Sequence, residues 1–210
     1  MRRPAMLTID GAGWCRQARH VQSPNRDARP DGVAVDLLVI HNISLPPGEF
    51  GGQQIIELFT NQLDCDAHPY FDQLRGLRVS AHFLIRRDGS LLQFVSTDER
   101  AWHAGVSSFR GRERCNDFSI GIELEGTDFE AFEDAQYKTL AALACALGAR
   151  YPLNAAAGHE HIAPGRKSDP GPHFDWFRVR QLYQQAVVAQ TPSPSNPHAL
   201  CFPEKSTGLP

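Results

Sequence analysis

The sequence lacks several features that would assign it to a common class of protein. No run approaches the roughly 18 consecutive apolar residues of a transmembrane helix, and no apolar segment of signal-peptide length follows the N-terminal Met-Arg-Arg. The five cysteines are odd in number and form no CxxC pair, which favours a reducing compartment over a disulfide framework. The formal net charge of −3 disfavours a broad basic face for nucleic acid. We therefore expect a cytoplasmic protein with no membrane and no nucleic-acid partner.

The composition that is present is typical of an ordinary globular domain. Hydrophobic residues make up 41% of the 210 residues and charged residues 21%, close to the globular average. Residues 191–210 contain five prolines and little to pack, which is typical of disorder. We therefore predict a single domain over residues 1–190 and a Pro-rich tail over 191–210 that is either disordered or loosely draped over the domain. Nine histidines are the first indication of metal or proton chemistry.

Hydrophobic periodicity and turn signals predict a mixture of strands and helices. The nearly continuous apolar run at 33–40 is typical of a strand buried on both faces. Asp88 and Gly89 predict a tight hairpin turn between strands at 81–87 and 91–95. Because strands and helices do not alternate strictly, the predicted fold class is α/β of the mixed α+β type, with a central mixed sheet flanked by helices. The other expected elements are helices at 53–63, at 134–150 and after a cap at Asp175, and a strand at 118–124.

Two strand positions carry polar side chains that a purely structural role would not require. His41 follows the first predicted strand, and it is either a hydrogen-bonded core histidine or a ligand at the end of a strand. Glu123 lies in the strand at 118–124 and either faces solvent or has a buried partner. The nearby Gly121 indicates the close approach of another group to that face.

The segment 158–171 gathers two histidines, a lysine and an aspartate between glycine and proline residues; these are His159, His161, Lys167 and Asp169. Two neutral imidazoles and one carboxylate give zinc three protein ligands and leave a fourth position for water, the arrangement of a catalytic site. Zinc lowers the pKa of such a water toward 7, and a nearby carboxylate can accept its proton.

Five stretches of the chain resemble the zinc-dependent N-acetylmuramoyl-L-alanine amidases, and within them the cytoplasmic 1,6-anhydro-N-acetylmuramyl-L-alanine amidases of Gram-negative bacteria. They occur in the family's order and cover roughly residues 15–185. The resemblance implies the amidase fold and a zinc cofactor. The stretches are VIHNISLPPGEFG (39–51), VSAHFLIRRDG (79–89), AWHAG (101–105), CNDFSIGIELEG (115–126) and IAPGRKSDPG (162–171).

The resemblance also implies a role for each residue of the site. His41, His159 and Asp169 match the zinc ligands. Glu123 matches the catalytic carboxylate, and Lys167 matches the cation that stabilises the developing oxyanion. The arginines at the substrate-binding positions are expected to face peptide carboxylates and the tryptophan to face the sugar. These positions are Arg78, Trp102 and Arg114.

One position departs from the family's pattern. Relatives often have Gly-His-x-Asp-Ile where this chain has His161 in place of the aspartate, so two histidines compete for the ligand role. We expect His159, which directly follows the glycine, to bind the metal, and His161 to be a loop histidine or to support the site from outside. His82 and His103 lie inside the matching stretches but match no ligand, and we expect structural or substrate-adjacent roles for them.

The activity that the resemblance implies is hydrolysis of the amide between the lactyl group of (1,6-anhydro)-N-acetylmuramic acid and L-alanine, in the recycling of peptidoglycan fragments. The partner is then a small muropeptide, and we expect a monomer. Three alternatives stay open. They are an amidase of lytic or phage type that acts on polymeric peptidoglycan, a recognition domain that binds peptidoglycan without cutting it, and a structural zinc domain with four protein ligands, one of them His161.

Overall fold

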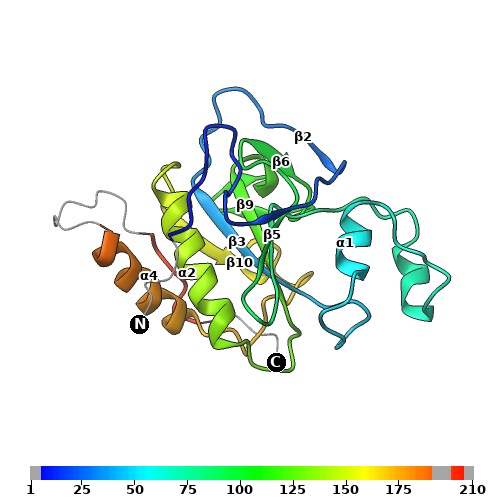
Figure 1. The fold of residues 1–210 in the computed structure, drawn as a ribbon. Helices are drawn as coiled ribbons and strands as arrows, with labels where there is room; N and C mark the ends of the chain where they lie inside the picture. The colour runs from blue at the N-terminus through cyan, green and yellow to red at the C-terminus, as the bar shows by residue number, and fades with distance from the viewer. Residues whose placement is uncertain (1–5, 191–199, 206–210) are drawn as a thin grey trace.

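The structure, a computed structural model, describes residues 6–190 and 200–205. At its centre lies a six-stranded sheet in the order β1-β5-β4-β9-β3-β10 (Figure 1). β4 and β5 pair antiparallel and the other neighbours pair parallel, so the predicted mixed sheet is confirmed. The strands are β1 (Arg19–His20), β3 (Leu37–Ile43), β4 (Phe83–Ile85), β5 (Leu91–Gln93), β9 (Ser119–Glu125) and β10 (Ala155–Gly158).

The two central strands, β3 and β9, carry the most informative polar residues. Each has seven residues, and they pair in parallel over their full length. Every β9 side chain is buried, so the alternative in which Glu123 faces solvent is wrong. The pairing extends past the predicted strand end at residue 40, and it places His41 inside the strand. Glu123 therefore has a paired strand on either side, β3 and β4, whereas His41 pairs with β9 and lies one residue past the last residue of β3 that pairs with β10.

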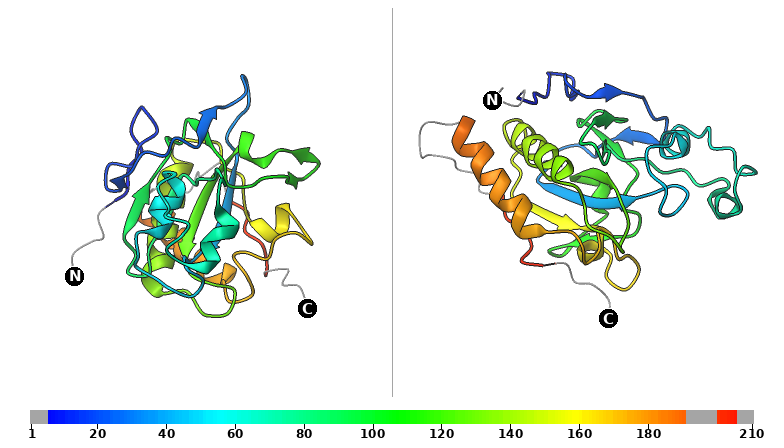
Figure 2. Two further views of the ribbon diagram at one scale, coloured as in Figure 1. Left: turned by 90° about the vertical axis from the view of Figure 1, so that its right-hand side faces the viewer. Right: turned by 60° about the horizontal axis from the view of Figure 1, so that its bottom comes forward.

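Two long helices, α2 (Asp134–Gly148) and α4 (Trp176–Gln190), lie side by side on one face of the sheet (Figures 1 and 2). Apolar residues recur at helical spacing in α2, so Tyr137 and Leu140 join the core formed with β3 and β9. Asp175 caps α4, because its Oδ1 accepts a hydrogen bond of 2.9 Å from the backbone N–H of Arg178. Both predicted helices are confirmed.

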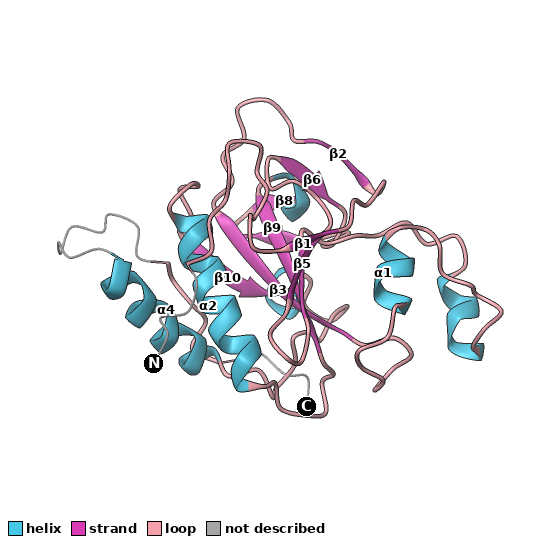
Figure 3. Ribbon diagram, in the orientation of Figure 1, coloured by secondary structure: helices cyan, strands magenta, loops and turns pink. Residues whose placement is uncertain are grey.

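Short helices and loops cover the opposite side of the sheet (Figure 3). Helix α1 (Gln54–Phe59) and the 3-10 helix η1 (Pro69–Leu74) pack with apolar residues of β4 and β5 in a second cluster. Helix α1 is shorter than the predicted 53–63, and Asn61 just beyond it takes a left-handed φ of 60°. The remaining short elements there and around the sheet are β2 (Arg26–Ala28), β6 (Glu99–Ala101), β7 (Ser108–Phe109), β8 (Arg112–Glu113) and η2 (Cys115–Asp117).

The segment 158–171 begins with regular structure. The residues of β10 pair in parallel with β3 and lead directly into α3 (His159–Ile162). The sequence signal for β10 was weak because three of its four residues are alanines, which have low strand propensity.

The C-terminal segment 200–205 packs on the domain. Leu200 is 7% exposed and belongs to the main core, Cys201 forms a bridge with Ala155, and the Phe202 ring lies 5.4 Å from that of Tyr183. The alternative of a disordered tail therefore does not hold for this stretch, because its apolar side chains find a surface to cover. Residues 191–199 and 206–210 lie outside the described part.

Within the described ranges, none of the helices combines the length and the apolar character needed to cross a membrane. Among the described residues, Cys15, Cys65, Cys115 and Cys145 take part in no disulfide.

Candidate active site

Four chain segments converge beside the carboxyl ends of the parallel strands. The register of β3 and β9 places His41 next to Glu123 on the same face. His159 directly follows strand β10 as the first residue of α3. The loop after α3 brings Asp169 close to both histidines. The carboxyl ends of parallel strands are where open sheets commonly bind ligands.

Three donor atoms form a small triangle at this point. The Nδ1 atoms of His41 and His159 are 3.1 Å apart, and Oδ2 of Asp169 lies 2.9 Å from the first and 3.1 Å from the second. Ligand atoms of a tetrahedral zinc with bonds of about 2.0–2.1 Å are about 3.3 Å apart. A single ion therefore fits against all three atoms with little movement.

The electrostatics of His41 suit a metal ligand. Its side chain is buried, and burial, followed by the neighbouring His159, lowers the pKa of His41 to about 4. The imidazole is neutral at neutral pH as a result. Only the neutral ring has a lone pair available for a metal.

Glu123 is the buried acid of the site. Its Oε2 has no hydrogen-bond partner among the described residues. Burial and the nearby carboxylate of Asp169 raise the pKa of Glu123 well above its usual value, and Lys167 partly opposes them. A buried carboxyl without a partner is costly and is typical of a functional site.

A cavity of about 220 Å³ exposes these groups to the outside. Its wall includes Trp102 and Lys167 together with the three triangle residues and Glu123. Lys167 and Asp169 also line a groove of about 830 Å³, which is lined by Tyr70 and Phe129 as well. The two hollows share lining residues and therefore lie next to each other.

The predicted substrate residues are placed less uniformly. Trp102 lines the small cavity, and its Nε1–H donates a hydrogen bond of 3.1 Å to Asp27. Arg78 is exposed and does not line either hollow. The side chain of Arg114 is 69% exposed, pairs with Asp117 at 3.3 Å, and lines a separate hollow beside the β7–β8 hairpin. The structure therefore brings together the residues predicted to bind zinc and to transfer protons, and it leaves both arginines outside the cavity.

His161 lies outside the triangle. Its Nδ1 accepts a hydrogen bond of 2.8 Å from the N–H of Gly158, and its Nε2 lies 3.3 Å from the carbonyl oxygen of Lys205. Its ring packs edge-on against Trp176. With both nitrogens engaged elsewhere, the geometry favours His159 as the ligand.

Sequence reasoning did not identify the part that His103 plays. Its Nδ1 lies 2.9 Å from Nε2 of His41. The available signal was Gly121, because a Cβ atom there would lie 2.4 Å from Cγ of His103. The close approach predicted from that glycine is the approach of this ring.

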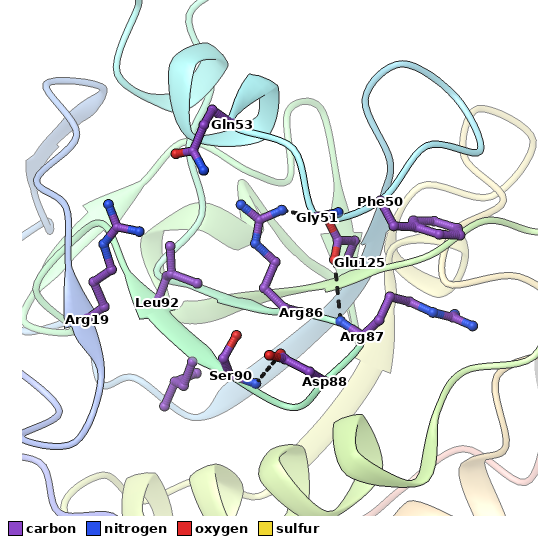
Figure 4. A pocket seen from close by; sticks show the side chains of 11 residues that line it. Arg19, Phe50, Gly51, Gln53, Arg86, Arg87, Asp88, Ser90, Leu92 and Glu125 are labelled. Atoms are coloured by element: carbon purple, nitrogen blue, oxygen red, sulfur yellow. Dashed lines mark hydrogen bonds and ion pairs between the residues drawn. The ribbon is translucent and has the colours of Figure 1, made fainter.

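A further cavity, of about 500 Å³, lies away from the triangle (Figure 4). At its floor, Glu125 accepts hydrogen bonds from Nη1 of Arg86 at 2.6 Å and from the N–H groups of Gly51 at 2.7 Å and Arg87 at 3.3 Å. The acid is satisfied by these contacts, which hold the loop after β3 in place. The arrangement is that of a structural ion pair.

Comparison with known proteins agrees with this geometry. Residues 31–172 match the N-acetylmuramoyl-L-alanine amidase family. The 1,6-anhydro-N-acetylmuramyl-L-alanine amidase AmpD of Citrobacter freundii is 63% identical over 172 residues, which are 81% of this chain and 92% of the relative. A crystal structure of a selenomethionine derivative of AmpD matches with a TM-score of 0.79 and 62% identity, covering 81% of this chain and 97% of that chain.

A solved complex is also similar to this chain. It is the amidase AmiD from Escherichia coli with the substrate anhydro-N-acetylmuramic acid-L-Ala-D-γ-Glu-L-Lys, at a TM-score of 0.53 and 29% identity, covering 84% of this chain and 65% of that chain. The matched region includes most of the chain in each comparison. The chain belongs to the N-acetylmuramoyl-L-alanine amidase family.

Proposed function

We propose that this protein hydrolyses the amide between the lactyl group of 1,6-anhydro-N-acetylmuramic acid and L-alanine in soluble muropeptides. The observation that carries the proposal is the triangle of His41, His159 and Asp169 beside the unpaired carboxyl of Glu123. The 63% identity to an amidase named for this reaction supports the substrate class.

The donor set fits zinc, with two imidazole nitrogens and one carboxylate oxygen at spacings that one tetrahedral ion can span. When bound, zinc acts as a Lewis acid on the scissile carbonyl and on water. Three protein ligands leave a position open, which a structural site with four closed ligands would not. The engagement of His161 elsewhere argues against that alternative.

Glu123 is suited to proton transfer in both directions. A carboxyl group whose pKa is raised by burial accepts a proton from the attacking water more readily than an exposed carboxylate, and it returns that proton to the leaving nitrogen of alanine. Its place on β9, one strand from His41, keeps the carboxyl at a fixed position relative to the ligands.

Lys167 supplies the positive charge. It lines both hollows and lies on the same loop as Asp169. Its ammonium group would offset negative charge on the tetrahedral intermediate, an effect of about 3 kcal/mol for a well-placed donor. Trp102 forms the apolar wall against which a sugar ring packs, and Arg78 and Arg114 would meet peptide carboxylates only from beyond the cavity.

The proposal is tested by product analysis. The zinc-loaded chain is incubated with 1,6-anhydro-N-acetylmuramyl tripeptide and, separately, with purified sacculi, and the products are identified by mass spectrometry. We expect free tripeptide and anhydro-sugar from the first substrate, loss of turnover with a chelator, and much slower release from sacculi.

Each alternative predicts a different result in the same assay. Equal or faster release from sacculi would favour an enzyme of polymeric peptidoglycan. Binding of the muropeptide without cleavage would favour a recognition domain. Zinc-loaded Glu123→Gln protein serves as the control for cleavage by contaminants.

A further inference from the structure

One short segment contacts both histidines of the triangle at Nε2, the ring nitrogen that does not face the triangle. His41 presents Nδ1 to the triangle, and its Nε2 lies 2.9 Å from Nδ1 of His103. His159 also presents Nδ1, and its Nε2 lies 3.1 Å from the carbonyl oxygen of Ala104. Residues 103 and 104 are adjacent, so one short stretch of chain serves both rings, through the His103 side chain and the Ala104 carbonyl.

The location of the proton on each imidazole ring can be deduced from its hydrogen-bond partners. A partner that can only accept requires the ring nitrogen to donate. A backbone carbonyl only accepts, so Nε2 of His159 carries the proton that it donates to Ala104, and its Nδ1 is free of hydrogen. For His41 the same reasoning begins further away. The hydroxyl of Ser119 lies 2.6 Å from the carbonyl oxygen of Cys115 and must donate to it.

The direction of the Ser119 hydrogen bond fixes the directions of the next two, from His103 to Ser119 and from His41 to His103. Because the single hydroxyl proton of Ser119 is used, Nε2 of His103, 3.2 Å away, must donate to that hydroxyl oxygen. A neutral His103 with its proton on Nε2 has a free lone pair on Nδ1, which accepts from Nε2–H of His41. The Nδ1 of His41 is therefore unprotonated and faces the triangle.

The segment itself is held in place on two sides. The side-chain oxygen of Asn116 accepts hydrogen bonds from the backbone N–H groups of His103, at 3.2 Å, and Ala104, at 2.8 Å. On the other side, the His103 ring lies against the backbone of Gly121, where a Cβ atom would overlap it. Nη2 of Arg166 adds a hydrogen bond of 2.9 Å to the Ala104 carbonyl.

We infer that His103 and Ala104 are positioning residues that hold the two metal-binding histidines as Nδ1 ligands. The His103 ring does this for His41 through a relay of hydrogen bonds formed by Ser119, His103 and His41, and the Ala104 carbonyl does it for His159. The inference rests on the proposed metal site. Outer groups that orient a ligand histidine typically contribute 10–100-fold to metal affinity.

The test measures zinc affinity of the full-length protein by competition with a chelator. We expect His103→Ala to weaken binding by roughly 10–100-fold. His103→Asn should recover most of this loss, because its Oδ1 takes the place of Nδ1 as the acceptor. Ser119→Ala touches no ligand, and it should weaken binding by a smaller factor. His20→Ala removes an exposed histidine outside the relay and should bind zinc as the wild type does.

A spectroscopic measurement reads the relay directly. In the zinc-loaded wild type, long-range ¹H–¹⁵N correlation spectra should show His103 with a protonated Nε2 and an unprotonated Nδ1. A proton on Nδ1 of His103 would overturn the inference, as would wild-type zinc affinity in both His103→Ala and Ser119→Ala. Failure of the wild type to bind zinc would instead overturn the proposed metal site, so the two failures are distinguishable.

Discussion

Replacing Gly121 with alanine would place a methyl group in space that the His103 ring occupies. The added Cβ would lie 2.4 Å from Cγ and 2.6 Å from Cδ2 and Nδ1 of that ring. Ordinary carbon contacts are about 3.5–4.0 Å, so the ring or the strand must move by about 1 Å. Because β9 is paired on both sides, we expect the ring to move.

A displaced His103 ring would lose the hydrogen bond that it accepts from His41. We expect a displacement of about 1 Å to break the 2.9 Å contact with His41, which leaves a buried N–H without an acceptor. Overpacking costs about 1–3 kcal/mol, and the unmade hydrogen bond costs about 1–3 kcal/mol. For a domain of this size each kcal/mol lowers Tm by about 2–4 °C, so we expect a loss of at least about 4 °C.

The assay pairs calorimetric melting of the zinc-loaded protein with chelator competition. Zinc affinity should fall by roughly 10-fold or more, the scale of a lost outer contact. Gly11→Ala is the matched control, because a Cβ at that position meets no atom within 4 Å. Wild-type Tm and wild-type zinc affinity in Gly121→Ala would refute the reasoning, since the ring would then have moved at no cost.

Three further predictions concern the metal, the chemistry and the pH dependence. His159→Ala should lose zinc and His161→Ala should keep it, as measured by metal analysis of the purified proteins; the reverse result would exchange their roles. Glu123→Gln and Lys167→Ala should keep zinc and lower turnover by about 100-fold or more, and loss of zinc in either would point to a structural role. Burial lowers the pKa of His82 to about 3, so this ring is neutral in the fold but protonates in the unfolded chain below about pH 6.5. The unfolding free energy should therefore fall by about 2 kcal/mol from this group between pH 7 and pH 5, and His82→Asn, followed by denaturant titration at both pH values, should lose that part of the pH dependence.

Local signals allowed the regular core to be predicted from the sequence. The Asp88–Gly89 turn, the apolar run of β3 and the helical spacing in α2 are each encoded within a few residues. The strands that were missed have two to four residues, too few for a periodic pattern. They form because neighbouring segments offer unpaired backbone groups, which is a tertiary effect.

The candidate site divides in the same way. The residues of the triangle lie within motifs that resemble a known family, and the structure brings them together. The relay behind them could not be predicted, because His103 and His41 are 62 residues apart and meet only through the sheet. Gly121 was the sequence signal for a close approach at this strand, but a glycine does not indicate which group approaches.

The parallel register of β3 and β9 limits the insertions and deletions that the candidate site can tolerate. His41 and Glu123 are opposite each other on adjacent strands, so their separation is set by the main chain and not by any loop. Inserting or deleting a single residue in β9 ahead of Glu123 would turn that side chain to the face covered by α2 and bring an aliphatic neighbour beside His41. Loops around the groove can lengthen or shorten and so alter which substrates fit, whereas a change of one residue in the length of β9 is enough to separate His41 from Glu123.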